Sequence, residues 1–349
     1  MNKIKVGVLG ATGAVGQKFV TLLEGHPWFE LTELAASDRS AGKSYKEAAV
    51  WRQYKPIPER LKATTVKPCE PTLDCRVVFS GLDSSVAGEV EESFARAGYI
   101  VLSNSKNHRM DADVPLLIPE INPEHLDLIK VQRRRRGWTG AIVTNPNCST
   151  IGLVMALAPI HRAFGVKRAI VVTMQALSGA GYPGHSAIDM LGNVIPFIGS
   201  EEDKVETEPL KIMGTLAGEE IRFADCRISA HTNRVFVEDG HMECVSLELE
   251  KKATPDEVAG VLARFSSLPQ ELKLPFAPER PVIVTDERDR PQPRFDRDAG
   301  NGMSAVVGRI RECPVFDIRL VVLSHNTIRG AAGAAILNAE LMSAQGLLE

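Results

Sequence analysis

One cysteine stands where a chain could use it as a nucleophile. Cys148 follows Asn145-Pro-Asn147 and lies between an expected strand, 141–144, and an expected helix, 151–164. A thiol at a helix N-terminus faces free backbone N–H groups and the positive end of the helix dipole, which lower its pKa. Asn147 can donate its side-chain amide to an oxyanion, together with the backbone N–H of Cys148. An isolated cysteine is more often a small buried apolar residue, but this polar approach favours a nucleophile.

A thiolate nucleophile needs a partner that accepts and returns protons. Of the eight histidines, His241 is the best candidate, because it follows a short expected strand and a Glu-Asp-Gly turn. Arg234 stands seven residues earlier and is suited to bind a carboxylate. His231 and His185 are rivals, since spacing alone does not choose among the three.

A glycine-rich loop follows the first expected strand and opens the first expected helix. It reads Gly-Ala-Thr-Gly-Ala-Val-Gly over residues 10–16. Glycines allow the tight turn, and the helix N-terminus offers free N–H groups to a pyrophosphate. The sequence therefore predicts a dinucleotide site in which six loop residues contact the cofactor: Gly10, Thr12, Gly13, Ala14, Val15 and Gly16.

The residues after the second expected strand should choose between the two nicotinamide dinucleotides, because the adenosine ribose lies there. Asp38 would favour a free 2′-hydroxyl and hence NAD. Ser37, Arg39 and Ser40 would favour a 2′-phosphate through charge-assisted hydrogen bonds. We favour NADP (NADPH), with a merely solvated Arg39 as the alternative.

Strands and helices must alternate to position these groups, and in the first third of the chain they do. Strands separated by helices form a parallel sheet with right-handed crossovers. The sequence predicts an N-terminal Rossmann-type, doubly wound parallel sheet. Its strands are expected at residues 3–9, 31–36, 76–79, 99–102 and 141–144, with helices such as 13–23 and 86–97.

From about residue 168 the connections lengthen, which predicts a second α+β domain with a mixed sheet. We place a dinucleotide-binding domain at 1–148, completed by a C-terminal helical segment, 326–349, and a catalytic and dimerisation domain at 149–325. The expected elements of the second part are strands at 168–175, 227–230, 234–237, 244–249, 281–284 and 315–323, a helix at 254–265, a loop at 287–302 and an alanine-rich helix at 330–345.

Composition excludes several classes of protein. The net charge of −3 gives no excess of positive charge that would bind nucleic acid. The one basic run, 133–136, is expected to be a solvated helix end. The six cysteines are far apart without a CxxC pair, so we expect no metal site, no disulfide scaffold and a reducing cytoplasm. Without an apolar run of about 18 residues, we expect no membrane span.

Six segments together resemble the aspartate-β-semialdehyde dehydrogenase family, in particular its archaeal and fungal-like branch. They are spread over nearly the whole chain, which makes the resemblance more specific than any one motif. The segments are Gly10–Gly16, Ser40–Lys43, Asn145–Thr150, Gln175–Tyr182, Asn233–His241 and His325–Gly333.

The resemblance implies roles around the reacting carbon. Cys148 resembles the family's nucleophile and His241 its acid/base. Gln175 resembles the residue that orients the bound acyl group, and Arg234 the clamp for the substrate's α-carboxylate. On the cofactor side, the resemblance implies contacts from Ser178, Gly179, Gly181 and Asn326, the last at the nicotinamide end.

The resemblance also implies a site for a phosphate and an amino group. Glu208 and Lys211 resemble the family's Glu-x-x-Lys pair, in which the carboxylate meets the amino group and the lysine helps to hold phosphate. They fit an i, i+3 surface pair as well. Arg109 resembles the phosphate-binding arginine, or could tie down a loop. The segment before it, Lys106-Asn107-His108, is unusually polar for this position.

The reaction that the resemblance implies is the NADPH-dependent reduction of 4-phospho-L-aspartate to L-aspartate 4-semialdehyde through a Cys148 thioester, with release of phosphate. A homodimer or homotetramer is also implied. Two alternatives differ. Malonyl-CoA reductase has a thiol leaving group and no use for Glu208 or Lys211. A non-catalytic NADP-binding protein of the same fold would have no use for the coexisting Cys148, Gln175, Arg234 and His241.

Overall fold

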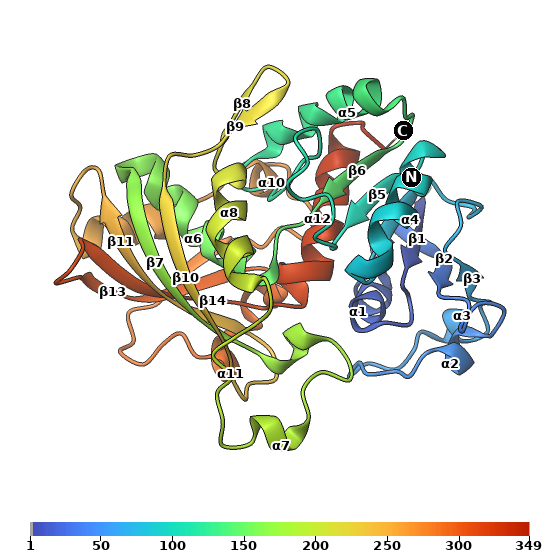
Figure 1. Ribbon diagram of the computed structural model, residues 1–349, viewed down its shortest axis with the longest axis horizontal. Coiled ribbons are helices and arrows are strands. Elements are labelled where there is room, and N and C mark those ends of the chain that lie inside the picture. The colour runs from blue at the N-terminus through green and yellow to red at the C-terminus, as the bar shows by residue number, and fades with distance from the viewer. Residues whose placement is uncertain (1–2, 349) are drawn as a thin grey trace.

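Short apolar runs in the first part of the chain form a parallel sheet with the order β3-β2-β1-β4-β5-β6 in the computed structural model, which describes residues 3–348 (Figure 1). Strands β4, β5 and β6 are buried on both faces, as parallel strands covered by helices must be. The elements are β1 (Ile4–Leu9), α1 (Ala14–Leu23), β2 (Phe29–Ala36), α2 (Tyr45–Ala48), α3 (Glu59–Lys62), β3 (Lys67–Pro68), β4 (Val77–Ser80), α4 (Ser84–Arg96), β5 (Ile100–Ser103), η1 (Pro123–Asp127), α5 (Leu128–Arg136) and β6 (Ala141–Thr144).

A second sheet, with the order β10-β7-β11-β14-β13-β12, mixes parallel and antiparallel pairs and lies beside the first (Figure 1). Helix α6 packs on one face of it and is buried along nearly its whole length. The elements are α6 (Cys148–Phe164), β7 (Val166–Gln175), η2 (Leu177–Ala180), α7 (Ala187–Met190), α8 (Glu201–Ile212), β8 (Thr215–Ala217), β9 (Glu220–Arg222), β10 (Arg227–Arg234), β11 (His241–Leu249), α9 (Pro255–Ala263), α10 (Leu268–Glu271), β12 (Val282–Val284), α11 (Pro293–Asp296), η3 (Ala299–Gly302), β13 (Ala305–Glu312), β14 (Ile318–Ser324), η4 (Ile328–Ala332) and α12 (Gly333–Ala344).

The predicted fold class is confirmed, whereas two predicted elements of the second part are wrong and one strand was missed. One continuous strand, β10, runs to Arg234, and residues 235–237 form an irregular turn instead of a strand. Strand β13 was not predicted, because Ala305-Val-Val-Gly is a short apolar run followed by charged residues. The predicted loop 287–302 contains the short helices α11 and η3.

The last helix, α12, belongs to the hydrophobic core of the first sheet. Ile336, Leu337 and Met342 are fully buried and share one cluster with Val6 and Phe79 of strands β1 and β4. Helix α1 lies on the same face, whereas Phe94 of α4 belongs to the cluster on the opposite face. The chain therefore returns at its C-terminal end to complete the first core.

A buried ion pair joins the two parts of the molecule. Arg329 of η4 donates to both carboxylate oxygens of Glu120, at 2.7 and 2.6 Å, and neither side chain is exposed. Its Nη2 also lies 3.0 Å from the sulfur of Met155 in α6. The bidentate contact fixes η4 to the segment that carries Glu120, and the contact with Met155 places η4 beside α6.

Neither a membrane-spanning helix nor a metal cluster occurs among residues 3–348. Each helix there is too short or too polar to cross a bilayer. No group of three His, Cys, Asp or Glu side chains in that part of the chain could hold a metal ion.

Candidate active site

Cys148 is the first residue of α6, directly after the carboxyl end of β6. Asn147 caps this helix, because its Oδ1 accepts hydrogen bonds from the backbone N–H groups of Ser149 (2.9 Å) and Thr150 (3.2 Å). The predicted strand-to-helix corner is therefore present. It directs the Cys148 side chain into a cavity of about 950 Å³ lined by residues from both domains.

The cavity is where the predicted nucleophile meets its predicted proton carrier. Sγ of Cys148 lies 3.3 Å from Nε2 of His241, the first residue of β11. The other ring nitrogen of His241, Nδ1, accepts a hydrogen bond of 3.1 Å from the backbone N–H of Ala176. A neutral imidazole in this setting carries its proton on Nε2, facing the sulfur.

Burial determines the charge state of both groups. Burial and the neighbouring Arg234 lower the pKa of His241 to about 3, so the ring is neutral at physiological pH. Burial, assisted by the charge of Glu201, raises the pKa of Cys148 to about 12, although Arg109 and Arg234 favour the thiolate. The expectation of a lowered thiol pKa was therefore wrong, because desolvation at this enclosed corner outweighs the helix terminus.

The enclosure of Cys148 comes from close packing of η4. A Cβ atom added to Gly330 would lie only 2.9 Å from Cβ of Cys148, so the backbone of η4 lies directly against the cysteine. The two rival histidines lie elsewhere. His231 is exposed on β10, and His185 is an exposed residue at the cavity rim.

Gln175 and Arg234 end neighbouring parallel strands, β7 and β10, where they are register partners. Nη1 of Arg234 donates to the carbonyl of Ala176 at 2.6 Å, and the guanidinium lines the cavity. Its buried Nε has no partner among residues 3–348. Gln175 is buried behind this wall, and its Nε2 lies 3.4 Å from Oγ1 of Thr173. Arg234 therefore has donor capacity left for an anionic ligand.

A second arginine, Arg109, also lines the cavity. Nη1 of Arg109 donates to Oε1 of Glu208 at 2.9 Å, and Nη2 donates to the carbonyl of Asn104 at 2.8 Å. The other oxygen of Glu208 accepts from the backbone N–H of Asn147 at 2.6 Å. Glu208 therefore links the arginine to the corner that carries Cys148, instead of facing the cavity as predicted.

Lys211 also differs from its predicted place. Its ammonium donates to the backbone carbonyls of Arg109, Asp111 and Val114, at 2.7, 2.7 and 2.8 Å, and it is almost completely buried. An ammonium has three donors, so these contacts engage all of them. Lys211 therefore has no donor left for a phosphate, which contradicts its predicted role.

Another Glu-x-x-Lys pair, Glu201 and Lys204, lines the cavity in their place. Oε1 of Glu201 accepts from Nδ2 of Asn147 at 2.7 Å, and Oε2 accepts from Nζ of Lys204 at 2.9 Å. Sequence reasoning missed this pair, although its spacing equals that of Glu208 and Lys211. Both pairs lie on α8, seven residues apart, and seven residues are nearly two helical turns. Spacing alone therefore could not choose between them.

The glycine loop joins β1 to α1 at the other end of the cavity. Gly10 has φ of +72°, and a Cβ there would lie 2.8 Å from the carbonyl oxygen of Gly81. A Cβ at Gly16 would overlap the carbonyl oxygen of Gly10, at 2.1 Å. Gly13 caps α1 without a side-chain hydrogen bond, and Ala14 and Val15 line the cavity. The free N–H groups of this helix start suit a pyrophosphate.

The remaining predicted cofactor residues form two groups, apart from Thr12. The first group lines the same cavity and contains Ser178, Gly179, Gly181 and Asn326. Asn326 accepts a hydrogen bond from the N–H of Gly240, just before β11, at 2.8 Å and donates one to Oγ of Ser178 at 2.8 Å. Thr12 lies within the loop, where its carbonyl accepts from Gln17. The second group contains Ser37, Arg39 and Ser40, in a turn at the carboxyl end of β2. The N–H of Ser40 donates to the carbonyl of Ser37 and closes this turn.

Comparison with known proteins identifies relatives over the full length. A family model described as "Semialdehyde dehydrogenase, NAD binding domain" matches residues 5–129, and "Semialdehyde dehydrogenase, dimerisation domain" matches residues 157–329. An aspartate-semialdehyde dehydrogenase of Archaeoglobus fulgidus is 54% identical over 97% of this chain and 98% of its own. One from Schizosaccharomyces pombe is 49% identical over 99% of each.

Solved structures agree with the sequence comparison. The crystal structure of aspartate semialdehyde dehydrogenase with NADP from Candida albicans has a TM-score of 0.91 and 44% identity, over 99% of this chain and 100% of that one. Aspartate semialdehyde dehydrogenase II from Vibrio cholerae, complexed with ASA, has a TM-score of 0.77 and 27% identity over 99% of both chains.

Proposed function

Because the chain belongs to the aspartate-semialdehyde dehydrogenase family, we propose that it reduces 4-phospho-L-aspartate to L-aspartate 4-semialdehyde with NADPH and releases phosphate. The observation that carries this proposal is the 3.3 Å contact between Sγ of Cys148 and Nε2 of His241 in a cavity that also contains Arg109 and Arg234. Reduction of an acyl phosphate through a thioester requires a cysteine nucleophile, cations for the departing anion and a proton carrier.

In the first step, Sγ of Cys148 attacks the acyl carbon, a carbon–sulfur bond forms and the carbon–oxygen bond to phosphate breaks. The thiol proton ends on the released phosphate. Arg109 and Arg234 favour the thiolate, against burial and Glu201. Asn147 has a second amide proton, and its Nδ2 lies 4.0 Å from Sγ, so it can donate to the oxyanion beside the backbone N–H of Cys148.

In the second step, the nicotinamide supplies a hydride to the thioester when it is bound. His241 holds its proton on Nε2, next to the sulfur, because Nδ1 accepts from the N–H of Ala176. It can therefore pass this proton to the cysteine sulfur as the carbon–sulfur bond breaks and the aldehyde leaves, and a proton taken up from solvent restores the neutral ring. Gln175, at the end of β7, is proposed to orient the acyl group.

The substrate carries three charged groups, and the cavity offers four side chains that complement them. We assign the α-carboxylate to Arg234 and the phosphate to Arg109 and Lys204. The α-ammonium is assigned to Glu201, which keeps lone pairs free beside its bonds to Asn147 and Lys204. Glu208 and Lys211 support this arrangement from behind the wall.

The cofactor assigned to the cavity is NADP. The glycine loop 10–16 and the N-terminus of α1 suit the pyrophosphate, since added Cβ atoms at Gly10 or Gly16 would fill the turn. The exposed turn at Ser37, Arg39 and Ser40 suits the 2′-phosphate. Ser178, Gly179, Gly181 and Asn326 border the nicotinamide end.

The test is a comparison of two substrate pairs with the purified chain. We expect NADP reduction with aspartate semialdehyde and inorganic phosphate, and little with malonate semialdehyde and coenzyme A. The latter pair is used by the rival malonyl-CoA reductase, which has no need of Glu201 or Lys204. Preference for coenzyme A would overturn the proposal.

The Cys148→Ala variant tests the covalent route. It removes the sulfur without altering the glycine loop, so NADP binding by fluorescence titration should persist while turnover is lost. Substantial residual turnover would contradict the thioester, and a wild-type chain that binds NADP without turnover would favour a non-catalytic binding protein.

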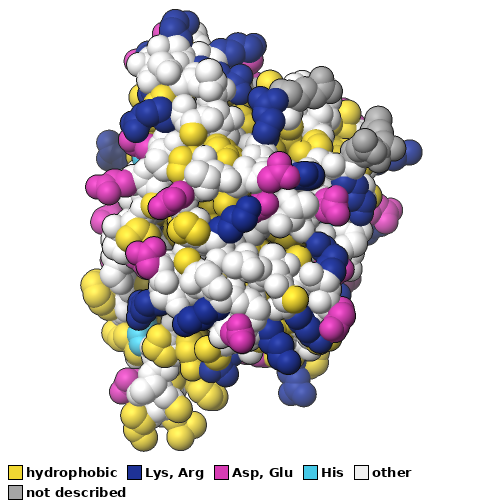
Figure 2. Space-filling view, turned by 90° about the vertical axis from the view of Figure 1, so that its right-hand side faces the viewer, with side chains coloured by type: hydrophobic (Ala, Val, Ile, Leu, Met, Phe, Trp, Pro, Cys, Tyr) yellow, Lys and Arg dark blue, Asp and Glu magenta, His cyan; other side chains and the backbone are white. Residues whose placement is uncertain are grey.

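We further propose that the chain assembles as a homodimer or a pair of dimers in the cytoplasm. The second domain matches a dimerisation-domain model, and the face of its sheet opposite α6 exposes Ile170 and Cys244. Figure 2 shows hydrophobic side chains gathered on a projection at the lower edge of the molecule, where α7 lies in Figure 1. All six cysteines are free among residues 3–348, which suits a reducing compartment.

A further inference from the structure

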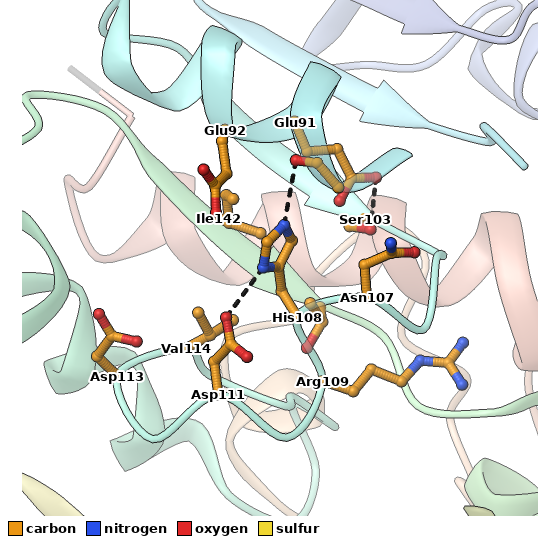
Figure 3. A network of polar contacts seen from close by, with 12 residues as sticks. Glu91, Glu92, Ser103, Asn107, His108, Arg109, Asp111, Asp113, Val114 and Ile142 are labelled. Atoms are coloured by element: carbon orange, nitrogen blue, oxygen red, sulfur yellow. Dashed lines mark hydrogen bonds and ion pairs between the residues drawn. The ribbon is translucent and has the colours of Figure 1, made fainter. Parts of the chain in front are cut away.

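The turn that carries Arg109 is closed by two contacts between His108 and Asp111. The backbone N–H of Asp111 donates to the carbonyl of His108 at 3.3 Å, and Nδ1 of His108 lies 2.9 Å from Oδ2 of Asp111. In Figure 3 the His108 ring points toward α4, whereas the Arg109 side chain extends to the right of the view, away from the ring. The histidine is therefore an anchor for the turn, outside the cavity that Arg109 lines.

Acceptors face both nitrogens of this histidine. On one side is the Asp111 carboxylate, and on the other is the carbonyl of Gly88 in α4, 3.4 Å from Nε2. A neutral imidazole has one N–H and can satisfy one of them, whereas an imidazolium donates to both. His108 is buried, so water does not readily replace the missing donor.

The charges around His108 also favour its protonated form. Asp111 lies on the same turn, and Glu91 of α4, which accepts from Oγ of Ser103 at 2.7 Å, lies nearby (Figure 3). Burial alone would lower the pKa of His108, but the bond to Asp111, the charges of Asp111 and Glu91, and the Gly88 carbonyl raise it above its usual value. The same contact lowers the pKa of Asp111 to about 2.

Other elements add cations at a greater distance from the ring. Arg136 of α5 donates to Oδ2 of Asp111 at 2.8 Å, and its Nη1 lies 3.6 Å from Glu92 of α4. Lys211 of α8 holds the carbonyls of Arg109 and Asp111. These contacts hold Asp111 and the backbone of the turn in either charge state of His108, but none of them replaces the contact of the His108 ring with Gly88 of α4.

We propose that His108 is a positioning residue for the phosphate subsite: as an imidazolium between Asp111 and Gly88, it fixes the turn that presents Arg109, so that phosphate binding weakens when His108 loses its proton. The inference rests on the proposed phosphate-dependent reaction. The sign follows from the raised pKa. The stabilising form is complete below the ordinary histidine range near about 6.5 and is lost as pH rises through the higher folded value.

The experiment measures KM for inorganic phosphate from about pH 6 to about pH 9, in the direction that oxidises aspartate semialdehyde. At the acidic end, His108→Gln should raise this KM on the order of tenfold over wild type, because glutamine cannot hold a second proton. At the alkaline end, the two values should converge to within about twofold, since wild type has lost the same proton. The ratio of the variant's KM to the wild-type KM cancels the effect of phosphate ionisation, which is the same for both proteins.

Two further variants separate positioning from general loss of structure. Asp111→Asn removes the carboxylate that favours the imidazolium, so the rise in KM should begin at lower pH than in wild type. His231→Gln, at an exposed histidine of β10, should give a ratio near one throughout. KM for aspartate semialdehyde and for NADP should change by less than about twofold in each variant.

The outcomes distinguish this inference from the proposed function. A ratio for His108→Gln that is constant with pH, or an equal rise in all three KM values, would overturn the positioning role while the reaction stands. A wild-type chain whose turnover does not depend on phosphate would overturn both.

Discussion

At the scale of single residues, the chemistry of the site depends on which atoms of Cys148 and His241 carry protons. Neutral His241 holds its proton on Nε2 because the N–H of Ala176 occupies Nδ1, and Cys148 rests as a thiol because its corner is enclosed. Sequence position suggested an activated thiolate. Burial instead favours a resting thiol, and the neighbouring Arg109 and Arg234 are the groups that favour loss of its proton.

The His241→Asn variant should lower kcat about 10²-fold or more, because it removes proton transfer while leaving the arginines in place. Steady-state kinetics with aspartate semialdehyde measures this. His231→Asn is the matched control, since His231 is exposed on β10, and it should leave kcat unchanged. A larger loss in the control than in the His241 variant would show that the proton carrier has been misassigned.

Single residues are also expected to decide which dinucleotide binds. Arg39→Ala should weaken NADPH binding by about tenfold and NADH binding by less than about twofold, because only NADPH carries a 2′-phosphate. Fluorescence titration of both dinucleotides measures the difference. Asp38→Ala is the companion variant and should mainly weaken NADH. Equal effects of Arg39→Ala on both cofactors would remove the 2′-phosphate assignment.

At the scale of elements, helix α8 shows what a sequence can and cannot predict. The strand-to-helix corner at Cys148, the glycine loop and the cavity position of Arg234 could be predicted, because each depends on local chain direction. The choice between Glu201-Lys204 and Glu208-Lys211 could not, since both pairs lie on one face of the helix. It depends on which turn of α8 reaches the cavity, and that is set by packing against Asn147 and the Arg109 turn.

The two lysines of α8 should separate binding from stability. Lys204→Gln should raise KM for phosphate by about tenfold with little change in the free energy of unfolding, because this lysine lines the cavity. Lys211→Met should instead lower the free energy of unfolding by about 3 kcal/mol, since it leaves three buried carbonyls without a donor. Kinetics and urea denaturation measure the two effects. The reverse pattern would restore Lys211 as the phosphate ligand.

At the scale of the whole molecule, the ion pair of Arg329 with Glu120 connects the first domain, α6 and the C-terminal segment. Arg329→Met should lower the free energy of unfolding by about 3 to 5 kcal/mol, because it leaves Glu120 charged and buried without a partner. Urea denaturation measures the loss.

The Arg329→Met/Glu120→Leu double variant is the control for that measurement. Removing both charges should recover much of the stability, as apolar replacements of buried pairs often do. Equal loss in the single and double variants would mean that shape around Arg329, instead of charge pairing, stabilises this junction.

Helix α12 has a consequence for how the molecule is made. Translation delivers the sheet strands β1 to β6 first, but one wall of their hydrophobic core is built from residues 332–348. A nascent chain halted after β14 would expose Val6 and Phe79 on the face that α12 later covers. The first half to leave the ribosome is therefore the last to complete its core, and a deletion near the C-terminus would destabilise the sheet that carries the glycine loop.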